Sequence, residues 1–100
     1  MINYERATAA PVVVAAAVTS GILVAASPKR VGLILTSPLS GTVTYSISPI
    51  AVSGLGIVLL AGQHPVILTL AQHGQIVQRQ WTLIHSAGGL SVEIYEIAEL

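Results

Sequence analysis

Paired carboxylates are the first residues to weigh, because general acid–base catalysis needs two of them converging on one cleft. The chain has 4 acidic residues, Glu5, Glu93, Glu96 and Glu99, and three of these lie close together near the C-terminal end. Glu93 and Glu96 would point to opposite faces of a strand, because side chains alternate with a period of two. We therefore expect solvated or edge-protecting charges and no catalytic pair.

Three imidazoles could hold a metal ion, and the chain has 3 histidines, His64, His73 and His85. Their spacings match no local metal-ligand motif. His64 precedes Pro65 and His73 precedes Gly74, so both are expected in surface turns. Cysteine is absent, which removes disulfides, thiolate metal sites and thiol nucleophiles. The sequence predicts no metal site and no cofactor.

The remaining chemical motifs are incomplete. No Gly-x-Ser-x-Gly elbow and no aspartate supports a serine nucleophile. The segment Gly54-Leu-Gly56 lacks the third glycine and the crossover helix of a dinucleotide loop. Lys29, Arg30 and Arg79 are too few for the cationic groove of a nucleic-acid reader. We expect a protein that is neither an enzyme nor a nucleic-acid binder.

Composition favours assembly. Of the 100 residues, 53% are hydrophobic and 8% are charged, and Lys plus Arg (4) balances Asp plus Glu (4). Such a chain fits one ordered domain, because disorder needs low hydrophobicity and high charge. A domain of this size leaves much apolar surface outward, and large exposed apolar patches mark interaction sites. We expect a homo-oligomer.

The apolar stretch 9–26 could also be read as a membrane helix or a signal-peptide core. Pro11 and the run Thr19-Ser-Gly21 interrupt a spanning helix, and Glu5 beside Arg6 does not make a positive n-region. We therefore expect no membrane segment. The residues expected at an interface are the apolar positions of the N-terminal region and the single tryptophan: Ile2, Tyr4, Val12, Val13, Val14 and Trp81. Trp81 fits a core or interface anchor better than a sugar-stacking platform.

Short apolar or alternating runs between turn residues predict strands. The expected strands are 12–18, 22–26, 31–36, 42–48, 57–60, 66–70, 80–86 and 90–97, with breaks at 61–65 and 71–75. This pattern indicates an all-β fold, a single-domain, jelly-roll-like β-sandwich or barrel of seven or eight short antiparallel strands. Residues 1–11 are expected to form an extended N-terminal arm and residues 12–100 the sandwich. The runs 31–36 and 57–70 carry no Lys or Glu against edge-to-edge aggregation, so burial or a partner must protect them.

Four segments resemble one family of viral proteins: Arg30–Thr36, Gly41–Ile47, Gly56–Gly62 and Gly88–Glu96. An arginine opens an aliphatic strand, a hairpin strand carries a tyrosine, a Gly-Ile-x-Leu-x-x-Gly-like segment follows, and a glycine-rich turn leads into an acidic, aliphatic last strand. This order is similar to that of the small β-sandwich decoration, or head-stabilising, proteins of tailed bacteriophages.

The resemblance implies a non-enzymatic virion protein on the capsid exterior, often a trimer, that binds the major capsid protein and stabilises the coat lattice. Two alternatives stay open. One is another phage structural component, such as a head-fibre base, tail or adaptor protein. The other is a carbohydrate-binding β-module.

Overall fold

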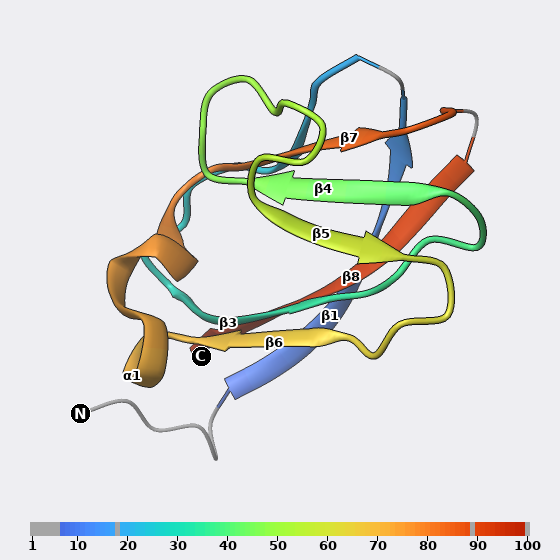
Figure 1. Cartoon of the computed structure of the whole chain (residues 1–100). Helices are drawn as coiled ribbons and strands as arrows, with labels where there is room; N and C mark the ends of the chain where they lie inside the picture. Colours follow the sequence, from blue (N-terminus) through green and yellow to red (C-terminus); the bar gives the residue numbers. More distant parts are fainter. Residues whose placement is uncertain (1–6, 18, 89, 100) are drawn as a thin grey trace.

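The computed structural model describes residues 7–17, 19–88 and 90–99. Within them, the chain forms eight strands in two four-stranded sheets and one short helical segment (Figure 1). The strands are β1 (Ala7–Ala16), β2 (Gly21–Val24), β3 (Arg30–Leu35), β4 (Thr42–Ser46), β5 (Ile57–Leu60), β6 (Val66–Thr69), β7 (Trp81–His85) and β8 (Leu90–Glu99). The helical segment is α1 (Leu70–His73) followed by the 3₁₀ turn η2 (Gly74–Gln78).

The strand order identifies the topology. One sheet runs β1-β8-β3-β6 and the other β2-β7-β4-β5, and every pairing is antiparallel. The first strand therefore pairs with the last, the second with the seventh, the third with the sixth and the fourth with the fifth. Rolling an antiparallel ribbon in this way gives the eight-stranded jelly roll. The predicted all-β sandwich is confirmed.

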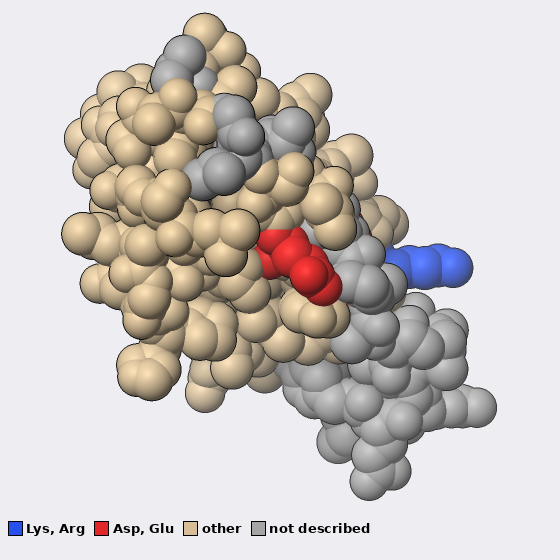
Figure 2. Space-filling model, turned by 90° about the vertical axis from the view of Figure 1, so that its right-hand side faces the viewer, with Lys and Arg blue, Asp and Glu red and all other residues tan. Residues whose placement is uncertain are grey.

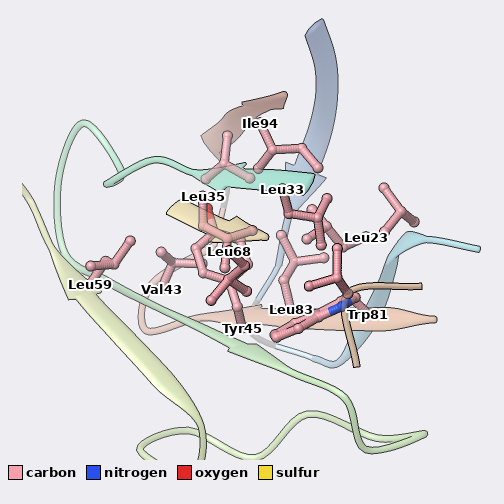
Figure 3. Packing of buried hydrophobic residues seen from close by; sticks show 13 residues of the cluster. Leu23, Leu33, Leu35, Val43, Tyr45, Leu59, Leu68, Trp81, Leu83 and Ile94 are labelled. Carbon is pink, nitrogen blue, oxygen red and sulfur yellow. The ribbon is translucent and has the colours of Figure 1, made fainter. Parts of the chain in front are cut away.

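The two sheets enclose one aliphatic core (Figure 3). In β3, Leu33 and Leu35 alternate inward and are fully buried, while Ile34 between them is only partly covered. Tyr45 and Trp81 supply the aromatic part of the core from the opposite sheet. Burying one large aliphatic or aromatic side chain stabilises a fold by about 1.5–3 kcal/mol, so this cluster is the main source of stability.

The N-terminal strand begins earlier than the sequence indicates. β1 starts at Ala7 and pairs with β8 along its whole length, from Ala7 opposite Glu99 to Ala16 opposite Leu90. The expected arm boundary at residue 11 therefore falls inside a paired strand. Pro11 is tolerated there because β1 is an edge strand and needs ladder hydrogen bonds on one side only. The rest of the expected arm, residues 1–6, lies outside the described residues.

The segment after β6 was expected to be an irregular break and is instead helical. The Thr69 side chain caps α1 by accepting a hydrogen bond from the Gln72 N–H at 3.2 Å. Gly74 ends the helix with a φ of 71°, a conformation that glycine adopts without strain. The following turn η2 then buries Val77 in the core.

The free edges of β5 and β6 carry no charge, yet each is protected by a turn residue. The Leu60 N–H donates to Gln63 Oε1 at 2.8 Å, and the Thr69 N–H donates to His73 Nδ1 at 3.0 Å. Both strands are only four residues long. Short length and side-chain capping thus replace the charges that usually blunt edge strands.

Candidate interaction surfaces

His85 is held inside the fold. Its Nδ1 accepts hydrogen bonds from the N–H groups of Ala87 and Gly88 at 3.0 and 2.9 Å, and its Nε2 lies 2.7 Å from the Ser40 carbonyl oxygen. These contacts define the neutral tautomer with the proton on Nε2. The ring joins the turn after β7 to the turn before β4, and neither ring nitrogen is free to bind a metal or a substrate.

The other two histidines do not join it. His64 is exposed, and the Nδ1 of His73 is occupied by the Thr69 N–H. Among the described residues, no three His, Cys, Asp or Glu side chains gather as a metal site would require. Of the acidic residues, Glu93 is exposed, Glu96 is partly buried, and the structure does not describe Glu5 or the Glu99 side chain.

Glu93 and Glu96 differ in environment. Glu96 pairs with Arg30, its Oε2 lying 3.4 Å from Nε. Glu93 instead accepts a hydrogen bond from the half-buried Tyr95, and this bond, with the charge of Glu93, raises the pKa of the Tyr95 phenol. The two carboxylates therefore serve separate contacts and do not converge.

Arg30 is the most heavily used polar side chain. It is 1% exposed, and its Nη1 donates to the carbonyl oxygens of Val77 and Arg79 at 3.1 and 2.9 Å. Its Nη2 donates to the Ala25 carbonyl oxygen at 2.5 Å. The guanidinium therefore binds the β2–β3 connection, η2 and β8 together. A cation satisfied in this way is a structural element of the fold and is closed to phosphate.

Trp81 lies in the core, one of the two roles expected for it. It is 3% exposed, and its Nε1–H donates to the Ile76 carbonyl oxygen at 3.0 Å. A covered ring cannot stack on a sugar. With Tyr45 and Ile57 it lines an apolar hollow of about 210 Å³ beside the β4–β5 loop.

Of the other residues expected at an interface, Val13 is 68% exposed, and Val14 packs against the core. Ile2 and Tyr4 lie outside the described residues, as does the side chain of Val12. Val13 also lines a hollow of about 310 Å³ with Thr36, Leu39 and Glu93 at the end of the sandwich where β3 finishes.

The β4–β5 loop, residues 47–56, was expected only as a connection, yet it carries several exposed aliphatic side chains. Ile50, Val52 and Leu55 are 69%, 51% and 66% exposed. The loop is nevertheless ordered, because the Ala51 N–H donates to the Ser20 hydroxyl at 2.7 Å and the Gly54 N–H donates to the Thr44 hydroxyl at 3.1 Å. Proline and glycine in this stretch indicated a turn. The aliphatic residues between them were the feature of the sequence that could have indicated an exposed apolar surface.

Charge is sparse over the rest of the exterior. Figure 2 shows one face on which the described residues are almost all uncharged, apart from a small acidic area and a protruding basic side chain. Inside, every buried side-chain nitrogen and oxygen atom of the described residues has a hydrogen-bond partner. The buried polar groups are therefore all engaged in internal contacts, while several aliphatic side chains face outward.

No family model, no curated protein and no solved structure matches the chain. Within the part of the chain that the structure describes, no helix combines the length and hydrophobicity needed to cross a membrane.

Proposed function

We propose that this protein is a non-enzymatic structural component of a phage virion, which binds the outer surface of the capsid as a homo-oligomer and stabilises the coat lattice. The order of strand signatures described above resembles that of capsid decoration proteins, and the trimer is the oligomer that this resemblance favours. The major capsid protein is the proposed partner. The resemblance suggests the class of protein, and the exposed aliphatic surface of the β4–β5 loop gives a physical reason for binding to a partner.

The aliphatic β4–β5 loop carries the proposal. Its three most exposed aliphatic side chains, Ile50, Val52 and Leu55, present a neutral surface on a backbone held by side-chain hydrogen bonds. A surface that is already ordered loses little conformational freedom on binding. Apolar contact contributes about 25 cal/mol per Å², so small contacts become effective when a lattice repeats them many times.

The buried polar groups support a structural role. Arg30 and His85 are residue types that often serve in binding or catalysis. Here the side chains of both form hydrogen bonds that link loops of the fold. A surface protein of a shell benefits from such internal bracing, because it must keep its loops in one geometry for every copy.

Co-sedimentation with purified, DNA-filled heads tests the proposal. Heads lacking this protein, from the phage that encodes it, should bind the wild-type chain saturably and should resist heat better once it is bound. Leu55→Ser, in the loop, should lower the bound fraction at least about tenfold, since it removes apolar contact worth roughly 1.5–3 kcal/mol. Leu39→Ser is the matched control, because Leu39 is 87% exposed in the turn at the other end of β4.

A second variant tests the N-terminal contribution. Deleting residues 1–6 removes Ile2 and Tyr4 and keeps every pair of the β1–β8 ladder. We expect the shortened chain to fold, with loss of oligomers in light scattering coupled to size-exclusion chromatography. A wild-type chain that is monomeric and does not bind heads would refute the proposed function.

A further inference from the structure

Two adjoining hollows lie at the end of the sandwich where β3 begins. Their volumes are about 260 and 390 Å³, and they share Ala26 and Arg79. We call the two together the Arg79 groove. Besides the shared residues, the groove is lined by Ser27, Pro28, Ile47, Ser48, Pro49, Gln75, Gln78 and Gln80.

Arg79 is the only charged side chain of the groove lining, and it is exposed. In the described part of the chain the one ion pair is that of Arg30 with Glu96, so no acidic group there neutralises Arg79. A guanidinium presents a planar set of donors that matches a carboxylate with two parallel hydrogen bonds. The groove therefore offers a free docking point for an acid.

The groove is built on a rigid frame. Buried Arg30 holds both walls, through the Ala25 carbonyl oxygen on one side and the Arg79 carbonyl oxygen on the other. The Ser27 N–H donates to the Gln78 carbonyl oxygen at 2.9 Å and closes the frame between them. A preformed site avoids the entropy cost of ordering its walls when a ligand binds.

The remaining lining suits a polyhydroxylated ligand. Gln75, Gln78 and Gln80 bring three amide groups, each with a donor and an acceptor, as sugar hydroxyls require. The Gln78 Nε2 already donates to the Pro28 carbonyl oxygen at 2.8 Å, which fixes that side chain and leaves its oxygen as an acceptor. Pro49 adds a small apolar surface for the C–H face of a sugar ring.

The same lining argues against a peptide. Known modes that bind a peptide along its length use a free strand edge, an apolar groove for a helix, an aromatic-lined groove or a cluster of arginines. The Arg79 groove contains no strand residue, no aromatic side chain and a single guanidinium. Open hollows with amide side chains and one cation favour an acidic sugar.

We propose that the Arg79 groove binds a carboxylated sugar unit of an acidic glycan, with Arg79 holding the carboxylate and the glutamine amides holding ring hydroxyls. This activity is independent of capsid binding. The groove includes only the first three residues of the β4–β5 loop, 47–49, and none of the exposed aliphatic residues Ile50, Val52 and Leu55.

The test is a titration of the ¹⁵N-labelled full chain with trigalacturonate, followed by two-dimensional NMR. Saturable shifts should appear at Arg79, Gln78, Gln80 and Ala26, with a dissociation constant on the order of 1 mM, as expected for one ordered sugar unit in an open site. The fully methyl-esterified trisaccharide has the same rings without charge and should bind at least about tenfold more weakly. Absence of saturable shifts, or equal binding of acid and ester, would overturn the proposal.

Two matched variants test whether the positive charge of Arg79 itself holds the sugar carboxylate. Arg79→Gln should weaken trigalacturonate binding about tenfold and abolish the preference over the ester. Lys29→Gln removes the same charge from an exposed residue of the neighbouring turn that does not line the groove, and it should leave both affinities within about twofold. Equal losses in the two variants would mean a diffuse charge effect and would refute the groove assignment.

A triglutamate peptide completes the experiment. It carries the same number of side-chain carboxylates on a polypeptide and should bind at least about tenfold more weakly than the trisaccharide. Binding of the peptide as tightly as trigalacturonate, with the same dependence on Arg79, would contradict the assignment to sugars.

Discussion

The Nε atom of Arg30 lies 3.4 Å from Oε2 of Glu96, and this contact joins the first residue of β3 to β8. The two partners are unequal, since the Arg30 side chain is 2% exposed and that of Glu96 is 28% exposed. Arg30 also binds three carbonyl oxygens, whereas Glu96 is partly solvated. The pair is therefore one contact of a larger arginine-centred network.

The first prediction concerns the asymmetry of this pair. Arg30→Met should lower the free energy of unfolding by about 3–5 kcal/mol, because it leaves carbonyl oxygens and a carboxylate without their donor. Glu96→Gln should cost about 1 kcal/mol or less, because solvent screens the partly exposed carboxylate. Urea unfolding followed by tryptophan fluorescence measures both. Equal costs for the two variants would show that the ion pair, and not the carbonyl contacts, dominates.

The second prediction concerns His85. His85→Leu should destabilise the fold by about 2–4 kcal/mol, because the N–H groups of Ala87 and Gly88 lose their acceptor and the Ser40 carbonyl loses its donor. The matched control is His64→Leu, an exposed site that should stay within about 0.5 kcal/mol of wild type. Thermal unfolding by circular dichroism distinguishes them. Comparable melting temperatures for both variants would show that the hydrogen bonds of His85 do not stabilise the fold.

The third prediction concerns alkaline pH and Tyr45. Burial raises the pKa of the Tyr45 phenol above its usual value of 10.0, so the folded chain keeps a proton that the unfolded chain loses. The resulting stability is fully present below pH 10 and declines as the pH rises above it, because the unfolded state then binds fewer protons. Urea midpoints measured from pH 8 to pH 11.5 should fall in the wild type.

Tyr45→Phe is the variant that tests this cause. It should cost about 1 kcal/mol at pH 7, since the hydroxyl donates to the Thr36 carbonyl oxygen at 2.8 Å, and it should show a flatter decline above pH 10. Tyr95→Phe removes a phenol that is less buried than that of Tyr45, and it should preserve most of the wild-type slope. A slope unchanged in Tyr45→Phe would place the alkaline transition on another group.

The fourth prediction concerns the edge strands. The double variant Gln63→Ala, His73→Ala frees the N–H groups of Leu60 and Thr69 at the edges of β5 and β6. It should aggregate faster than wild type at equal concentration, because uncapped, uncharged edges pair with other chains. Light scattering at 37 °C gives the rates. Gln72→Ala, at an exposed α1 residue, is the control and should aggregate at the wild-type rate.

Much of the fold could be predicted from local patterns. Strict alternation in 42–48 and the turn residues around the apolar runs placed eight strands close to their observed positions. Two local errors have clear causes. Pro11 hid the start of β1 because an edge strand tolerates proline. The strand expected at 66–70 ends one residue earlier, because the Thr69 side chain caps α1, which begins at Leu70.

The sequence by itself determined the all-β class, the scarcity of charge and the lack of a local catalytic or metal motif, because these depend on composition and short-range spacing. Only the tertiary structure decided what each polar residue does. By residue type alone, a role in nucleic-acid binding, catalysis or sugar binding was conceivable for Arg30, His85 and Trp81. In the folded chain they form hydrogen bonds with residues 47, 45 and 5 positions away, and these bonds stabilise the interior. Arg79 shows the converse, because its position in a groove depends on loops distant in sequence that meet when the ribbon rolls up.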